Sequence, residues 1–155
     1  TMDVATGGGD NQTLARGYAD AVNSVGVVVY HYSLFDNPIN NFLTEQHIER
    51  FGTPPDLWAE AGFNCATMIN DAVTATGGDT SGDALVAALE GMKFQGPKGD
   101  YEVRASDHAL LQPMTLVRLT NTTDPDFKFV ELVTAFTPAE TAPPCSVPAD
   151  LGRCE

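Results

Sequence analysis

Basic side chains are scarce in this sequence: eight lysines and arginines stand against 21 aspartates and glutamates, which gives a formal net charge of -13. A protein that binds nucleic acid or an anionic membrane surface needs clustered positive charge to neutralise phosphates, and the sequence contains no basic stripe. The composition therefore argues against a nucleic-acid partner and against an anionic lipid surface.

Long apolar runs are also lacking. No stretch approaches the roughly 20 apolar residues that span a bilayer. The first residues lack the basic and apolar regions of a signal peptide. Such a start fits either a cytosolic protein or a chain whose own beginning is missing.

The usual motifs of catalysis and metal binding are missing: no Cys-x-x-Cys or zinc-type Cys/His spacing, no Gly-x-Ser-x-Gly and no His-Glu-x-x-His. Asp107 beside His108 could orient a general base, but catalysis also needs a nucleophile or a metal. The other histidines, His31 and His47, lie far away in sequence. We therefore interpret Asp107 and His108 as a turn at the end of a strand, and expect no catalytic residue, metal ion or cofactor.

The three cysteines are few enough to consider one by one. Cys145 and Cys154 flank a short segment with proline and glycine near the C-terminus. We predict that they form a disulfide, which implies an oxidising compartment. Two unpaired thiols in an unstructured tail are the alternative. Cys65 falls on the apolar stripe of a predicted helix, so we expect it to be a buried free thiol.

The 155 residues are 43% hydrophobic, which is enough for one domain with a substantial core. The most informative segment runs from Thr53 to His108. Its first half has apolar residues at helical spacing, with Thr53 as the candidate cap and Gly77 at the exit. The apolar positions expected to face inward are Trp58, Ala61, Cys65, Met68, Ile69, Ala72 and Val73.

A second helix is predicted from a cap at Ser81 to a close near Gly91. Residues 96–99, Gly-Pro-Lys-Gly, then turn the chain into a strand. In that strand Tyr101 and Val103 alternate with polar residues, which is the pattern of a half-buried strand. The expected order is helix, helix, turn, strand.

The flanking segments also favour an α/β fold. Residues 25–32 form a continuous apolar run, typical of a strand buried on both faces of a parallel sheet. A helix should start at Pro38 and stop at Gly52. Its inward residues are expected to be Ile39, Phe42, Leu43, Ile48 and Phe51. Residues 114–119 and 127–134 are predicted to form an antiparallel pair.

Residues 7–10, three glycines and an aspartate, precede a helix that Asn11 or Thr13 can cap. A glycine loop that opens a helix exposes backbone N–H groups to an anion. Without the lysine and hydroxyl of a P-loop, the glycines say little about a nucleotide. A flexible turn between strand and helix is the alternative.

Several short phrases resemble one family by their order and spacing. They are Gly62-Phe63-Asn64-Cys65-Ala66, Ala88-Leu89-Glu90-Gly91, Phe94-Gln95-Gly96-Pro97-Lys98-Gly99 and Asp107-His108. Together they resemble the C-terminal part of type I periplasmic substrate-binding proteins. The nearest branch is the leucine/isoleucine/valine-binding family of ABC importers, which also takes up amides and aromatic acids. The resemblance spans nearly the whole chain, which would be less than half of such a protein.

The resemblance implies part of a two-lobed fold, in which Rossmann-like α/β lobes are joined by hinge-crossing segments. Residues 1–36 would be the end of the second lobe and residues 37–112 part of the first lobe. Residues 113–136 would be hinge-crossing strands that return to the second lobe. Residues 137–155 would be a proline-rich tail that contains the disulfide.

The implied function is that of the extracytoplasmic solute-binding component of an ABC transporter. It would bind a small polar ligand (a branched-chain amino acid, an amide or an aromatic acid) by hinge closure and deliver it to a membrane permease. The location would be periplasmic or extracellular, and the chain's own beginning would be missing. A chain cut through two lobes should expose apolar surface, so we expect it to associate with the missing N-terminal part or with itself.

The resemblance also assigns candidate ligand-binding residues. They are Gly8, Gly9 and Asp10 from the second lobe, Trp58 and Glu60 from the first lobe, and Tyr32 at the hinge. The residues alone leave other interpretations open. Tyr32 and Trp58 can be packing residues, and Glu60 can lie on a solvated helix face.

Two other classes of function remain open. A sensory ligand-binding domain of a receptor shares the fold but should be followed by a membrane span, and the end with its prolines and cysteines argues against it. A small stand-alone α/β enzyme would use Asp107 and His108.

Overall fold

The computed structural model describes residues 9–145 and 147–154, so Gly8 lies outside the described residues. The strands form two separate antiparallel sheets, one with the order β1-β5-β6 and the other with the order β2-β3-β4. Their bounds are β1 Val25–Val28, β2 Lys93–Gly96, β3 Gly99–Val103, β4 Leu110–Leu111, β5 Met114–Leu119 and β6 Val130–Phe136. The chain is therefore a mixed α/β structure, as predicted.

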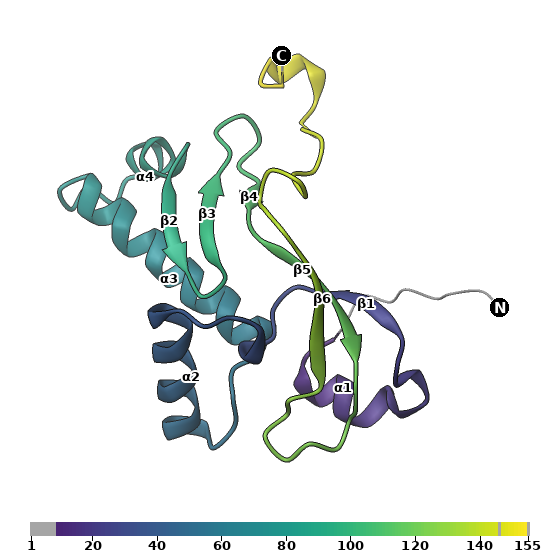
Figure 1. Cartoon of the computed structure of the whole chain (residues 1–155). Coiled ribbons are helices and arrows are strands. Elements are labelled where there is room, and N and C mark those ends of the chain that lie inside the picture. Colours follow the sequence, from purple (N-terminus) through teal and green to yellow (C-terminus); the bar gives the residue numbers. More distant parts are fainter. Residues whose placement is uncertain (1–8, 146, 155) are drawn as a thin grey trace.

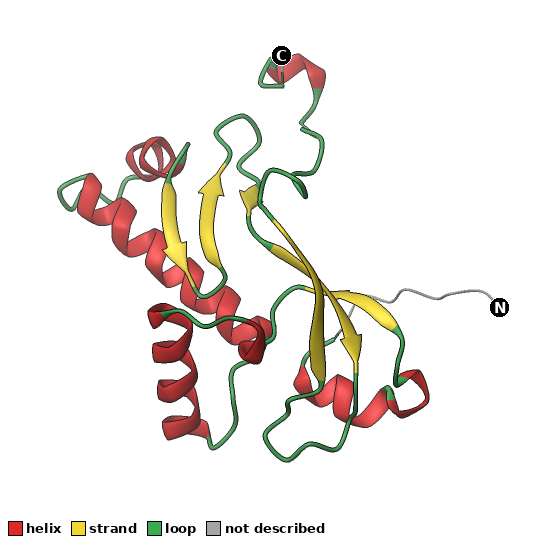
Figure 2. Ribbon diagram, in the orientation of Figure 1, coloured by secondary structure: helices red, strands yellow, loops and turns green. Residues whose placement is uncertain are grey.

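The helices divide between the two sheets (Figures 1 and 2). The α-helices are α1 Asn11–Gly17, α2 Pro38–Phe51, α3 Leu57–Ala75 and α4 Gly82–Leu89, with short 3-10 helices at residues 19–21, 32–34 and 149–151. We call α1 with β1, β5 and β6 the strand-rich unit, and α2 to α4 with β2, β3 and β4 the helix-rich unit. In the part of the chain that the structure describes, no helix has the length and apolar character to cross a membrane.

The helix boundaries follow from local chemistry. Pro38 is the first residue of α2, and Gly52 ends it in the left-handed conformation with φ 72°, as predicted. Ser81 precedes α4 as expected. The cap of α3 is Asp56 rather than Thr53, because the Asp56 carboxylate accepts hydrogen bonds from the first free N–H groups of the helix, that of Trp58 at 3.0 Å among them.

The predicted strand pattern is confirmed in two places and wrong in one. Tyr101 and Val103 are buried on β3, and β5 pairs with β6 in antiparallel fashion. The apolar run at 25–32 gives only the four residues of β1, which pair antiparallel with β5. Within this run, Val27 of β1 and Val29 just after it are exposed. A continuous apolar run does not specify strand direction, and here it forms an outer strand of a three-stranded sheet.

The period of α2 and α3 was predicted correctly, and Leu43 and Ala72 are buried as predicted, but several other residues predicted to face inward are exposed. On α3, Trp58, Cys65 and Ile69 point outward, with Trp58 69% exposed, while Glu60 and Asn64 are buried. On α2, the exposed apolar residues are Phe42, Ile48 and Phe51. Cys65 is therefore a free but exposed thiol, and Glu60 does not lie on a solvated face. The helical period shows which residues share a face, but the partner element decides which face is covered.

A polar contact decides the orientation of α3. The buried Tyr101 hydroxyl of β3 donates a hydrogen bond to the Glu60 carboxylate, and the Asn64 amide donates to the same oxygen at 2.5 Å. Gly96 on β2 allows this approach, because a Cβ there would lie 2.6 Å from the Tyr101 ring and 2.7 Å from the Asn64 amide oxygen. The β2-β3 hairpin thus packs on the polar side of α3.

Three chain segments run between the two units: residues 29–37, residues 112–113 and residues 137–143. We call them the first, second and third joining segments. Asn40, which is 2% exposed, fixes the first segment on α2, because its amide donates to the Tyr32 and Phe35 carbonyls at 2.9 and 2.6 Å. The Tyr30 hydroxyl donates to the Asn40 oxygen at 2.7 Å. The chain path at this joint is therefore held by hydrogen bonds.

His31 fixes the other side of the first joining segment. The ring is 1% exposed, and Nε2 lies 2.9 Å from the Phe127 carbonyl oxygen in the loop between β5 and β6. Because a carbonyl can only accept, Nε2 carries the proton, and Nδ1 accepts from the Ser33 hydroxyl at 2.9 Å. Burial lowers the pKa of His31 to about 4. The ring is therefore neutral at pH 7.

The C-terminal segment contains the predicted disulfide. Cys145 and Cys154 are bonded, with their Cα atoms 5.7 Å apart. Arg104 of the helix-rich unit donates to the Pro143 carbonyl at 2.8 Å, and Arg153 pairs with Glu90 at 2.7 Å. The tail is attached to the helix-rich unit at both ends of the disulfide loop.

Replacing Gly96 with alanine should lower the free energy of unfolding by about 1–3 kcal/mol, because the new methyl group would overlap the Tyr101 ring and the Asn64 amide. Urea unfolding of Gly96→Ala measures this change. Gly62→Ala is the matched control, since the space around Gly62 on α3 is open. It should leave stability unchanged or raise it by about 0.5–1 kcal/mol. Equal effects of the two substitutions would contradict the described packing.

The pKa of His31 predicts a specific acid sensitivity. As pH falls from 6.5 to about 4, His31 binds a proton in the unfolded chain but stays neutral in the folded protein. The free energy of unfolding should therefore fall by up to about 3 kcal/mol. Urea unfolding across this pH range tests it. His31→Gln keeps a donor for the Phe127 carbonyl and does not titrate, so its pH dependence should be weaker by that amount. An identical pH dependence in both proteins would rule out a neutral buried ring.

Candidate functional site

A groove of about 340 Å³ lies between the two units. The helix-rich side contributes Ile48, Gly52 and Pro54, and the strand-rich side contributes the loop between β5 and β6. Its lining residues are Tyr32, Ile48, Gly52, Pro54, Pro125, Asp126, Phe127 and Lys128. The lining is polar and apolar in about equal measure, and a groove of this size can hold a small organic molecule.

Tyr32, predicted to lie at the hinge, lines this groove. Its hydroxyl donates a hydrogen bond to the Asp126 carbonyl at 2.5 Å, and its ring stacks on His31 with the centroids 5.2 Å apart. Burial raises the pKa of the Tyr32 hydroxyl, with Asp126 and Asp124 acting in the same direction. The residue is half-buried and connects the first joining segment to the strand-rich unit.

The predicted loop residues Gly9 and Asp10 lie beside the start of α3. Asp10 caps α1, and its carboxylate accepts from the Thr13 backbone N–H at 2.7 Å. This bond lowers the pKa of Asp10, and a hydrogen bond from the Trp58 side chain adds to the effect. Asn11 donates to the Pro55 carbonyl at 3.4 Å. The fold thus brings Asp10 and Trp58 together, and Gly9 precedes Asp10 in the chain.

Glu60 is placed apart from this group. The side chain is 2% exposed, and its carboxylate is bonded to Tyr101 and Asn64 beneath the β2-β3 hairpin. Burial raises the pKa of Tyr101, so the hydroxyl stays protonated and donates to the carboxylate. In this arrangement Glu60 holds α3 on its sheet.

Sequence patterns gave no sign of two residues that organise the joint, Asn40 and Lys98. Both are almost fully buried polar side chains, at 2% and 5% exposure. Lysine in a glycine-rich turn is usually solvated, so nothing in the phrase Gly-Pro-Lys-Gly indicated burial. A polar residue next to a helix start, as at Asn40, likewise suggests solvent. Burial of both depends on contacts between distant segments.

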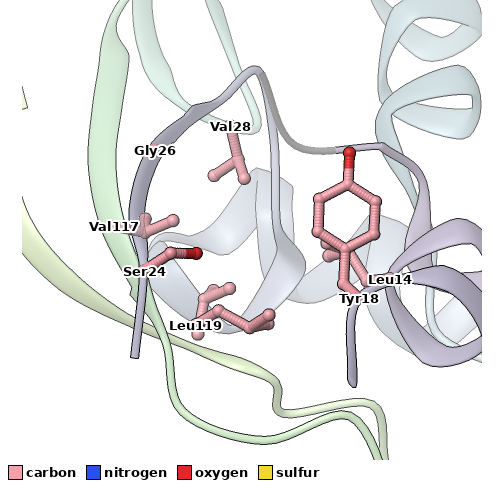
Figure 3. A pocket seen from close by; sticks show the side chains of 8 residues that line it. Leu14, Tyr18, Ser24, Gly26, Val28, Val117 and Leu119 are labelled. Carbon is pink, nitrogen blue, oxygen red and sulfur yellow. The ribbon is translucent and has the colours of Figure 1, made fainter. Parts of the chain in front are cut away.

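A second cavity lies inside the strand-rich unit (Figure 3). Leu14 of α1 and Tyr18, the residue after α1, face Val28, Val117 and Leu119 of the sheet across it. Its volume is about 20 Å³, which is room for about one water molecule. This cavity is too small for an amino acid, so the groove at the joint is the better candidate site.

Asp107 and His108 form a turn, as predicted. Arg104 binds the Asp107 carboxylate through two nitrogens, at 2.7 and 2.5 Å. His108 has φ 60° and places Nε2 2.8 Å from Glu90. Asp107 is thus bonded to Arg104, and His108 is bonded to Glu90.

Comparison with known proteins places this geometry in a family. The family model described as "Periplasmic binding protein" matches residues 1–124. An ABC-type branched-chain amino acid transporter from Rhodopseudomonas palustris is 33% identical, with a TM-score of 0.80 over 92% of this chain and 38% of that protein. None of the curated proteins compared with the chain matches it significantly.

Two more distant structures share the fold. One is a solute-binding protein of an ABC transporter from Rhodopseudomonas palustris, solved with 3,4-dihydroxybenzoic acid (22% identity, TM-score 0.71, 83% of this chain and 34% of that one). The other is a leucine-, isoleucine-, valine-, threonine- and alanine-binding protein from Brucella ovis (17%, 0.68, 84% and 35%). The chain spans well under half the length of each.

The family match covers most of the chain, and the structural similarity extends over both units. The predicted resemblance and the predicted fold class are therefore confirmed, and the chain belongs to the periplasmic binding protein family.

Proposed function

We propose that this chain is part of the extracytoplasmic solute-binding component of an ABC transporter. The protein binds a small polar solute between its two lobes and delivers it to a membrane permease. In this proposal residues 1–36 and 113–136 belong to the second lobe, residues 37–112 belong to the first lobe, and residues 137–155 are the tail. No covalent chemistry is involved, so the protein is not an enzyme.

The observation that carries the proposal is the groove lined from both units at the joint. Closing the units on a solute would bring Ile48 and Pro54 toward Asp126 and Phe127. A solute that contacts both sides binds the closed arrangement better than the open one, and this difference in affinity shifts the population toward closure. The short joining segments keep the two walls opposite each other.

The groove favours a solute with an apolar body and a polar end. Tyr32 and Phe127 offer aromatic surface, and Lys128 and Asp126 offer charge at the rim. The relatives described above are, by their descriptions, a branched-chain amino acid transporter, a protein in complex with a dihydroxybenzoic acid and a binding protein for small aliphatic amino acids. We propose a branched-chain amino acid, an amide or an aromatic acid as the ligand class.

The proposed contacts come from the predicted set. Tyr32 lines the groove, and Gly9, Asp10 and Trp58 are proposed as further contacts, with Asp10 and Trp58 meeting where the start of α1 lies beside the start of α3. Trp58 is well placed to meet a ligand, because its indole is 69% exposed. We leave Glu60 out of the contact set because its carboxylate is already bonded within the protein. Gly8 lies outside the described residues.

A location outside the cytoplasm follows from the same proposal. The Cys145–Cys154 disulfide supports it, because such bonds persist in the periplasm and in secreted proteins and are rare where thiols are kept reduced.

We also propose that the exposed apolar side chains of α2 and α3 are covered in the working protein, by a further part of the same protein or by a second copy. Phe51 is 68% exposed and Ile69 is 60% exposed. A groove of about 200 Å³ between the helices is lined by Phe42, Phe51 and Phe63 among others. Exposed apolar surface on this scale marks an interaction site.

Ligand binding can be followed at Trp58, the only tryptophan, whose indole N–H gives a single peak in a nitrogen–proton NMR spectrum. Titration with L-leucine, leucinamide or benzoate should move this peak and the amide peaks of Gly9, Asp10 and Tyr32 in a saturable way. Tyr32→Ala should weaken binding about tenfold, which corresponds to about 1.4 kcal/mol. Amide peaks of Lys93 and Glu102, far from the groove, are the internal control. If none of the three compounds moves these peaks, the proposed ligand class is wrong.

Association can be measured by native mass spectrometry of the 16.5 kDa chain over a range of concentrations. The chain alone should form dimers, because uncovered phenylalanines on α2 gain from leaving water. Exchanging both Phe42 and Phe51 for serine should restore the monomer, while Arg16→Ser on α1 is the control and should not. A folded monomer at every concentration would contradict the proposed covering of α2 and α3.

A further inference from the structure

Lys98 is a buried cation at the turn between β2 and β3. The side chain is 5% exposed, and Nζ donates to the Val29 carbonyl at 2.9 Å and to the Gln112 side-chain oxygen at 2.5 Å. The Tyr101 ring lies beside it, with its centroid 5.8 Å from Nζ. The residue belongs to the helix-rich unit, but both of its acceptors lie outside that unit.

These acceptors lie on different joining segments. Val29 opens the first segment immediately after β1, and Gln112 opens the second segment immediately after β4. The Thr141 hydroxyl of the third segment lies 3.2 Å from the Thr137 carbonyl of its own segment and 3.4 Å from the Gln112 backbone carbonyl. One ammonium group therefore connects the helix-rich unit directly to the first and second joining segments.

Because Lys98 is buried, the loss of either hydrogen bond would be costly in free energy. Burial lowers the pKa of Lys98 to about 8, an effect that Glu60 opposes, so the side chain is mostly charged at pH 7. A buried charge without acceptors is costly, and its cost is not recovered by neighbouring apolar contacts. A movement of either segment away from Nζ would leave the cation without a partner. An apolar side chain of the same length would allow the segments to slide.

We propose that Lys98 is a positioning residue that holds the first and second joining segments together and so sets the relative orientation of the two units. If the joint is the hinge of a solute-binding protein, as proposed above, Lys98 also sets how readily the solute groove closes. The role differs from ordinary core packing, because it acts on the orientation of the units and not on the fold of either one.

The orientation can be measured without any solute, as the distance distribution between two spin labels. Cys65 on α3 is a free, exposed thiol, and the disulfide protects the other two cysteines. Arg16→Cys on α1 gives a second exposed thiol in the strand-rich unit. Double electron–electron resonance on this doubly labelled protein should give one narrow distribution.

Lys98→Met in the labelled protein should broaden the distribution at least twofold or shift its maximum, while far-ultraviolet circular dichroism stays unchanged. Lys93→Met is the matched control, because the Lys93 side chain on neighbouring β2 is 73% exposed and pairs with Glu102 of the same hairpin. It should keep the narrow distribution. Lys98→Met with a normal spectrum and the same narrow distribution would overturn the proposal.

Gln112→Leu gives a second route if Lys98→Met does not fold. It removes one acceptor on a half-buried residue and should also broaden the distribution. A folded Gln112→Leu protein with an unchanged distribution would then overturn the proposal. Since no solute is present, the result is separate from the ligand titration. If the chain binds none of the three compounds but Lys98→Met still broadens the distance distribution, the proposed function is contradicted and the positioning role of Lys98 is supported.

Discussion

The joint between the two units depends on one constraint, that every polar group buried there must find a partner. Buried polar groups without hydrogen bonds are rare in proteins because each costs free energy that apolar packing does not return. At this joint the Asn40 amide donates to the backbone after β1, and the His31 ring donates to the loop between β5 and β6. The Lys98 ammonium donates to oxygens on two joining segments. In this arrangement these bonds fix the paths of the first and second joining segments. The groove beside Tyr32 takes its shape from those paths.

Much of the fold follows from local patterns in the sequence. The order of α3, α4 and the β2-β3 hairpin, the start of α2 at Pro38 and the pairing of β5 with β6 depend on caps, turn residues and alternation, all of which act within a few residues. The orientation of α3 does not follow from local sequence patterns. Its polar face meets the sheet because the Tyr101 hydroxyl, 41 residues away in sequence from Glu60, needs an acceptor. No local pattern contains that requirement.

The candidate site shows the same division. Tyr32 and Trp58 were predictable as functional candidates because large aromatic residues at element ends are either packed or presented to a ligand, and the structure leaves Trp58 exposed. Lys98 was not predictable. Whether a turn lysine is solvated or buried depends on whether carbonyl and amide oxygens from other segments converge on it, as those of Val29 and Gln112 do. Cys65 is exposed for a related reason, since the face of α3 that carries it is opposite to Glu60.

The contrast between the joint and the outer faces has a consequence for motion. Apolar contacts are non-directional and change gradually when helices slide, whereas hydrogen bonds to a buried cation are lost over a short displacement. A joint held by Lys98, His31 and Asn40 should therefore prefer a small number of discrete orientations over a continuous range. A solute-binding protein needs discrete orientations, because its open and closed states can then differ in their affinity for the solute. Binding of the solute then shifts the population from one state to the other. Phe42, Phe51 and Phe63 line a groove separate from the one at the joint, so covering them would stabilise the helix-rich unit without restricting that exchange.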